Sequence, residues 1–133
     1  MKRSFITLFN HHLTLEQELD AKEHLLVDNF IYPNSEIQKA WGEVPANVIS
    51  LKNYLSPIIS WLKNIGKEKD FLLVQGDFGA TFYMVECAFK LGLIPIYATT
   101  KREAIEETLE TGEIKISRIF KHVMFRKYEQ YKI

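Results

Sequence analysis

Residues 71–98 read FLLVQGDFGATFYMVECAFKLGLIPIYA, and this stretch decides the fold. The run at 71–75 is apolar up to its last residue, which is typical of a central parallel strand covered on both faces. A tight loop at 76–79 follows, then a largely apolar helix at 80–91 and a second strand at 93–98. A strand, a helix and a strand at this spacing predict a right-handed βαβ unit.

The segments before residue 71 add two predicted strands and a helix to this βαβ unit. Residues 4–9 and 27–32 are apolar and rich in β-formers, and they predict two further strands. Between them, Thr14 and Gln17 have the spacing of a capping box, so a helix is expected from there to about Leu26.

Two more helices are expected before residue 71. Ser35 and Gln38 repeat the capping-box spacing and predict a short helix through Trp41. Apolar residues recur at helical spacing between 51 and 65 and predict a buried helix. Pro57 interrupts it, so either this helix is kinked or Pro57 occupies its first position.

The C-terminal third supports two interpretations. Gly112 separates two runs with partial alternation, which favours a β-hairpin centred there and a strand through Phe125. A helix at 101–109 is the alternative. The prediction is one domain, residues 1–133, with an α/β fold of Rossmann-like type: a mainly parallel sheet flanked by helices, with a C-terminal β-hairpin.

Composition narrows the class of protein. The chain has 133 residues, 47% hydrophobic, and its one cysteine, Cys87, cannot form an intramolecular disulfide, which suits a reducing cytoplasm. We expect no signal peptide and no membrane span. The formal net charge of zero argues against a DNA duplex as partner. Residues 103–113 are nevertheless rich in glutamate, and Lys and Arg dominate 115–132, so a local basic face can hold a small anion.

Three polar loops follow three of the predicted strands. They are Asn10-His11-His12, the segment from Gln75 to Gly79, and the segment from Thr99 to Arg102. Because parallel strands end at the same edge of a sheet, we expect these loops to gather around a ligand crevice there.

The loop Gly76-Asp77-Phe78-Gly79, with Thr81 after it, lies between a strand and a helix. Its glycines allow close approach of a ligand to the backbone, and a helix N-terminus favours anions. It has neither the Gly-Lys-Ser/Thr of a Walker loop nor the glycine spacing of the dinucleotide fingerprint. Asp77 acting as a helix cap in a tight turn is the alternative.

The third loop offers a clamp for phosphate. Thr99 and Thr100 carry hydroxyl groups, and Lys101 and Arg102 carry two fixed positive charges. A solvated surface loop is the alternative.

Histidines supply the candidate acid–base groups. His11, next to Asn10, can act as a general acid or base near neutral pH. No metal site and no cofactor are predicted, because no metal-ligand spacing of histidines occurs and His24 falls on a charged helix face. His122 is expected on an exposed strand face with a structural role, and Cys87 is expected in the core.

Several segments together resemble a small stand-alone CRISPR-associated family of the Csx series. They are residues 8–11 with 13–14, residues 74–81, residues 94–102, and residues 120–123 with 125–128, so the resemblance covers nearly the whole chain. Gln-Gly-Asp-Phe-Gly and Thr-Thr-Lys-Arg are its most specific parts. The resemblance implies a minimal relative of the CRISPR-associated Rossmann fold, the sensor domain of type III antiviral defence. It also implies a homodimer that holds a cyclic oligoadenylate across its two-fold axis.

The activity that the resemblance implies is that of a ring nuclease. A ribose 2′-hydroxyl of cyclic tetra-adenylate attacks the adjacent phosphate without a metal, which gives linear products with 2′,3′-cyclic phosphate ends. Lys101 or Arg102 would then stabilise negative charge, backbone N–H groups of 76–79 would cradle a phosphate, and His11 would orient or deprotonate the hydroxyl.

Three other readings stay open. The first is a sensor or sponge that binds cyclic oligoadenylate without cleaving it. The second is a nucleotide-binding α/β enzyme of phosphoribosyl or flavin type, unrelated to defence. The third is a structural interaction module, against which the polar loops at one sheet edge argue.

Overall fold

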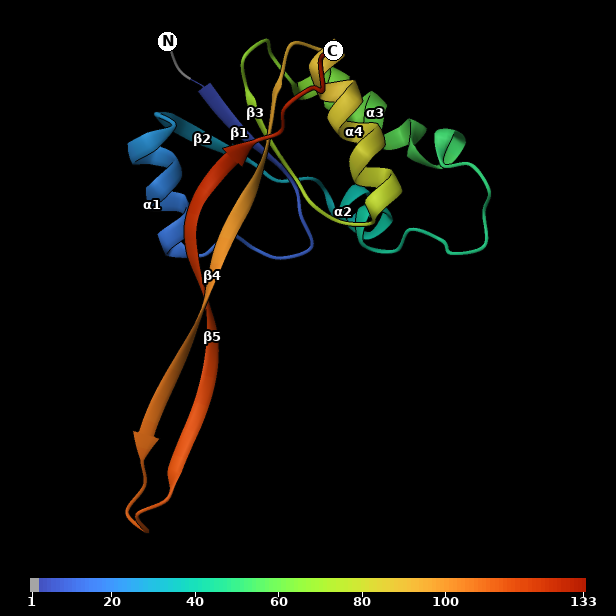
Figure 1. Cartoon of the computed structure of the whole chain (residues 1–133). Helices are drawn as coiled ribbons and strands as arrows, with labels where there is room; N and C mark the ends of the chain where they lie inside the picture. The colour runs from blue at the N-terminus through green and yellow to red at the C-terminus, as the bar shows by residue number, and fades with distance from the viewer. Residues whose placement is uncertain (1–2) are drawn as a thin grey trace.

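The structure is a computed structural model that describes residues 3–133. Helices and strands alternate along most of the chain (Figure 1). Their bounds are β1 Arg3–Leu8, α1 Leu15–His24, β2 Val27–Ile31, α2 Ser35–Gly42, α3 Lys52–Ile65, β3 Phe71–Val74, α4 Phe78–Lys90, β4 Ile94–Thr108 and β5 Ile114–Lys127.

The five strands form one mixed sheet in the order β2-β1-β3-β4-β5. The pairs β1–β2, β1–β3 and β3–β4 are parallel, and β5 runs antiparallel to β4. The expected α/β class, with four parallel strands, flanking helices and a C-terminal hairpin, is therefore confirmed. The helical alternative for 101–109 is wrong, because these residues continue β4.

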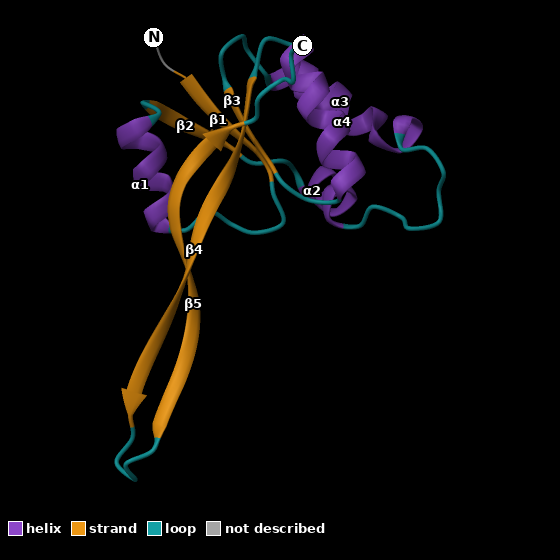
Figure 2. Ribbon diagram, viewed as in Figure 1, coloured by secondary structure: helices purple, strands orange, loops and turns teal. Residues whose placement is uncertain are grey.

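Helices cover both faces of the sheet. Helix α1 lies on one face, and α2, α3 and α4 lie on the other (Figure 2). Strand β3 is buried throughout and serves both layers: Phe71 and Leu73 pack in the cluster on the α1 side, whereas Leu72 and Val74 pack against α3 and α4. The uninterrupted apolar run that predicted a central strand thus fills two cores.

The helix starts follow local side-chain chemistry. At α1 the expected capping box is present: the Gln17 N–H donates to Thr14 Oγ1 at 3.1 Å, and the Thr14 N–H donates to Gln17 Oε1 at 2.9 Å. At α2 the expectation of Ser35 as cap is wrong, because Asn34 caps the helix by accepting from the Ile37 N–H at 2.9 Å. Pro57 lies inside α3, which continues through it.

Strands β4 and β5 continue beyond the body of the molecule as a two-stranded arm (Figure 1). We use "the arm" for residues 101–121, from the pair Lys101–Lys121 outwards. The arm is joined to the body at a β-bulge: Thr99 pairs with Met124 and Thr100 with His122, so Val123 is an extra residue on β5.

This pairing corrects the prediction of a polar loop at 99–102. All four residues are part of β4, because β5 pairs with their backbone and keeps it extended. Polar composition suggests a loop here, but the partner strand lies about twenty residues further along the chain, so no local pattern indicates the pairing.

Candidate functional site

A cavity of about 280 Å³ lies on the α1 side of the sheet, where the loop after β1 meets the base of the arm. We call it the histidine cavity. Its lining residues are Phe9, His11, His12, Thr14, Glu16, Gln17, Thr100, Phe120 and His122. Two of the three predicted loop segments, the one after β1 and the one in β4, therefore meet here, as the parallel strands require.

Aromatic and hydroxyl groups make up much of this lining. The rings of Phe9 and His11 lie edge to face, with centroids 5.4 Å apart. His12 lies near Tyr32, with centroids 6.2 Å apart, so the two adjacent histidines have different neighbours. Thr100 and Phe120 contribute from the two strands of the hairpin.

His122 is the most constrained group of the cavity. Its side chain is only 6% exposed, and its Nε2 lies 2.7 Å from Asp20 Oδ2 on α1. The other oxygen of Asp20 lies 2.6 Å from Nδ1 of His24. The Nδ1 of His122 is buried without a hydrogen-bond partner among residues 3–133. Asp20 therefore holds this imidazole in one orientation at the cavity wall.

The prediction that His122 is on an exposed face is wrong, and the bulge is the reason. Phe125 faces the core under α1, and strict alternation from it would turn Val123 inwards and His122 outwards. The extra residue at Val123 reverses the phase, so His122 faces α1. Its partner Asp20 is 102 residues away in sequence, and no local pattern indicated the pair.

The two predicted cations lie on opposite faces of β4. Neighbouring residues of a strand face opposite sides, so Arg102 shares a face with Thr100, while Lys101 faces away and pairs with Lys121. The guanidinium of Arg102 lies 5.2 Å from the ring centroid of Phe120, which lines the cavity. Of the two cations, Arg102 is the one placed beside the histidine cavity.

Thr99 has a structural contact at the bulge. Its Oγ1 donates to the Met124 carbonyl at 3.1 Å and accepts from the Met124 N–H at 3.2 Å. This side chain thus holds the position at which the hairpin changes phase.

The predicted glycine loop after β3 lies on the other side of the sheet. Gln75 Oε1 accepts from the Ala98 N–H at 2.7 Å, and the Gln75 carbonyl accepts from Trp41 Nε1 at 3.0 Å. Asp77 caps α4 by accepting from the Ala80 N–H at 3.0 Å, which was the alternative reading of this residue. The residues from Gln75 to Thr81 do not belong to the lining of the histidine cavity.

The other residues predicted to bind the ligand lie outside the histidine cavity. Asn10 lies against Gly42 at the end of α2. Phe78 is 96% exposed, and with Thr81 it lines a hollow of about 540 Å³ beside the C-terminal residues Tyr128 to Tyr131. The structure therefore divides the predicted site residues between two faces.

Gly76 illustrates why this loop needs glycine. A Cβ at this position would lie 2.9 Å from the Trp41 indole, whose N–H is bonded to the adjacent carbonyl. We expect Gly76→Ala to lower the free energy of unfolding by about 1–2 kcal/mol, because the indole must shift. Urea denaturation would measure this. Gly79→Ala is the matched control, since its Cβ would meet Leu51 at an ordinary 3.5 Å; equal losses in both variants would contradict the explanation.

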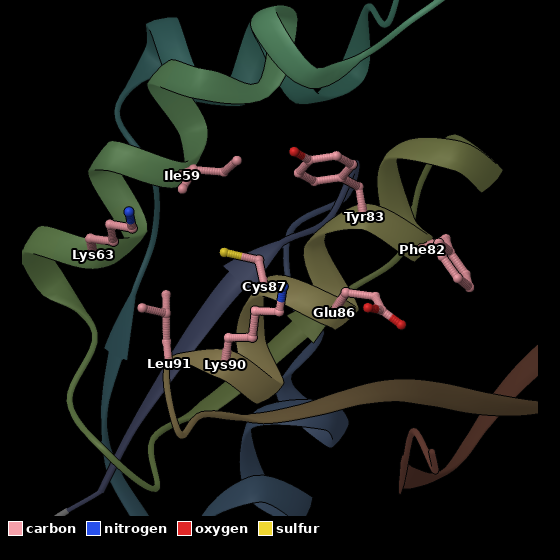
Figure 3. A pocket seen from close by; sticks show the side chains of 8 residues that line it. All are labelled: Ile59, Lys63, Phe82, Tyr83, Glu86, Cys87, Lys90 and Leu91. Atoms are coloured by element: carbon pink, nitrogen blue, oxygen red, sulfur yellow. The ribbon is translucent and has the colours of Figure 1, made fainter. Parts of the chain in front are cut away.

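A groove of about 650 Å³ separates α3 from α4 (Figure 3). In the figure the sulfur of Cys87 points towards α3, where Ile59 and Lys63 lie across the groove. Cys87 is half-buried at the margin of the core, not inside it as expected. Burial raises the pKa of its thiol, and the charges of Lys63 and Lys90 offset only part of this rise.

The raised pKa makes Cys87 a poor nucleophile at neutral pH. Only the thiolate reacts, so we expect its alkylation by iodoacetamide at pH 7 to be slower than that of a free cysteine. The rate should rise about tenfold per pH unit and still be rising at pH 9. Mass spectrometry of timed samples, with the urea-unfolded chain as control, gives both rates. A rate that levels off near pH 8 would contradict the raised pKa.

These features define the class of protein: a mixed α/β domain with a histidine-lined cavity at the sheet edge and a projecting hairpin arm. The chain belongs to the uncharacterized protein MJ1673 family, whose model matches residues 3–126. It is 47% identical over 131 residues to uncharacterized protein MJ1673 from Methanocaldococcus jannaschii, an alignment that covers 98% of this chain and 100% of that protein. No solved structure matches the chain with significance.

Two further findings concern the described part of the chain. Within residues 3–133 no helix is long and apolar enough to cross a membrane. Over the same residues, no three His, Cys, Asp or Glu side chains are grouped so that they could hold a metal ion.

Proposed function

We propose that this protein is a metal-independent phosphodiesterase that opens a cyclic oligoadenylate, as a cytoplasmic ring nuclease of type III CRISPR defence. The observation that carries the proposal is the histidine cavity, which combines imidazoles, a threonine hydroxyl and phenyl rings beside Arg102. Such a set suits an adenine ring, a ribose hydroxyl and a phosphate in one place. The resemblance to the Csx series supplies the identity of the ligand.

The topology supports a ligand at this edge. In the order β2-β1-β3-β4, the connection from β1 runs to one side and that from β3 to the other, so the strand order reverses between β1 and β3. Ligands of such sheets bind outside the carboxyl ends of the strands near this reversal. His11 lies in the loop after β1, at that end of the sheet.

The size of the cavity limits how much ligand one chain holds. Its volume of about 280 Å³ lies just below the roughly 300–1,000 Å³ usual for small-molecule sites. One chain then accommodates one nucleotide unit, and the rest of a cyclic tetra-adenylate extends to a second copy. Two copies also double the number of arginines around four phosphates.

The chemical step needs positioning and charge stabilisation. The ribose 2′-oxygen attacks the adjacent phosphorus, and the bond from phosphorus to the 5′-oxygen of the next nucleotide breaks. The departing 5′-oxygen takes a proton from water to become a hydroxyl group, and a 2′,3′-cyclic phosphate remains. His11 accepts the proton of the 2′-hydroxyl, and Arg102 stabilises the negative charge that develops on the phosphoryl oxygens. His122, held by Asp20, orients the bound nucleotide.

Incubation of the purified protein with labelled cyclic tetra-adenylate in EDTA tests the proposal. Linear products that end in a 2′,3′-cyclic phosphate support it, and His11→Ala should then slow the reaction. The control is the protein inactivated by heat. If neither tetra- nor hexa-adenylate rings are cleaved or bound, the proposal fails.

Binding without cleavage is the second candidate, and the position of Lys101 favours it. Because Lys101 faces away from Arg102, one chain presents a single cation to the cavity and not the pair that was predicted. Retention of intact ligand in the same experiment would establish a sensor or sponge.

A further inference from the structure

The arm lacks the cover that a two-stranded ribbon normally needs. Residues 104–116 are all exposed, and the arm projects from the body with no helix over either face (Figure 1). An isolated two-stranded ribbon is at best marginally stable in water. Within the arm, eight consecutive cross-strand pairs nevertheless form, from Lys101–Lys121 to Thr108–Ile114. Something outside this chain is expected to cover the ribbon.

One face of the arm is apolar along β5. Ile114, Ile116 and Phe120 occupy alternate positions of the strand, interrupted only at Arg118, and so lie on the same face. Their exposed fractions are 63%, 59% and 67%. Large apolar side chains that are scattered singly are ordinary, but three that share one face of an exposed ribbon mark an interaction surface.

The charges of the arm divide between its two ends. The distal part, residues 106–115, carries four glutamates and one lysine. The part next to the body, residues 101–105 with 116–121, carries four Lys or Arg and one glutamate. On the face that carries the apolar row, Glu106 lies in the distal part and Arg102 and Arg118 lie closer to the body, so this face is complementary to itself when reversed.

We propose that the arm binds the arm of a second copy of this chain, face to face and antiparallel about a two-fold axis. Reversal brings Glu106 of each copy towards Arg102 of the other, and it brings Ile114 of one copy towards Phe120 of the other. Pairing through the free edge of β5 is disfavoured, because an antiparallel pair centred on Arg118 would place Lys115 opposite Lys121.

This interface also bears on the histidine cavity. Phe120 lines the cavity and belongs to the apolar row, so the second copy lies next to the mouth of the cavity. The association itself needs no ligand. Its test is therefore independent of the proposed cleavage of cyclic oligoadenylate, and either can fail without the other.

Sedimentation velocity of the full chain tests the interface. We expect a species of twice the 15.6 kDa chain mass at micromolar concentration. The double variant Ile114→Ser and Ile116→Ser should raise the dissociation constant by about a hundredfold or more, because each lost side chain counts twice in a two-fold interface. Ile49→Ser is the matched control, since Ile49 is fully exposed in the loop before α3 and should leave the dimer unchanged.

Variants with exchanged charges distinguish a weakened interface from a misfolded arm. Glu106→Lys with Glu110→Lys should weaken the dimer, and adding Arg102→Glu with Arg118→Glu should restore it, because the charges on the interacting face are then exchanged. Circular dichroism confirms that each variant is folded. A wild-type chain that stays monomeric up to 100 µM would overturn the proposal, as would a dimer that resists both the serine and the lysine variants.

Discussion

Replacing Arg102 by alanine should slow the cleavage of cyclic tetra-adenylate by about 10²–10³-fold, the effect of removing one group that stabilises a charged transition state. The reason is its position: Arg102 lies over Phe120 at the histidine cavity, on the face that carries Thr100. Single-turnover rates at saturating enzyme measure the chemical step without contributions from product release.

Lys101→Ala is the matched control for Arg102→Ala. It removes a cation from the next position in the same strand, but from the opposite face. We expect a reduction of less than about tenfold, from the loss of long-range attraction alone. Equal losses in the two variants would show that the faces of the strand do not decide which cation acts. A larger loss for Lys101→Ala would place the ligand on the other face.

The body of the molecule could be predicted from the sequence because its signals are local. The apolar run at 71–75 and the capping box at Thr14 and Gln17 depend on residues within a few positions of one another. The same holds for Asp77, whose carboxylate caps a helix that begins at the next residue. Such features persist whatever the rest of the chain does.

The candidate site was harder to predict because it depends on contacts between distant residues. Residues 99–102 are polar and suggest a loop, yet pairing with β5 makes them a strand and sends Lys101 and Arg102 to opposite faces. The bulge at Val123 then reverses the alternation on β5 and buries His122. Both errors have one cause, since the register between two strands is not encoded in either strand alone.

One sequence signal did exist for the buried pair. Asp20 and His24 are four residues apart on α1, the spacing at which side chains on a helix meet. That pattern alone indicates a surface contact. Only the packing of β5 on α1 adds His122 to it and draws the carboxylate between two imidazoles.

The pairing of Asp20 with His122 leads to the second large prediction, Asp20→Ala. This change leaves both ring nitrogens of a buried imidazole without a partner, and we expect it to lower the free energy of unfolding by about 2–3 kcal/mol. The melting temperature should fall by about 10 °C in a domain of this size. Differential scanning calorimetry of the variant and the wild type at one protein concentration measures the loss.

The controls for Asp20→Ala distinguish the buried contact from the exposed one. The side chain of His24 is 72% exposed, so His24→Ala should change stability by less than about 0.5 kcal/mol. Adding His122→Leu to Asp20→Ala should recover part of the loss, because an apolar side chain needs no hydrogen-bond partner in the same place. If the double variant is no more stable than Asp20→Ala, the cost does not come from the unpaired imidazole. If His24→Ala lowers the free energy of unfolding as much as Asp20→Ala, the exposed contact between His24 and Asp20 is the one that holds α1 on the hairpin.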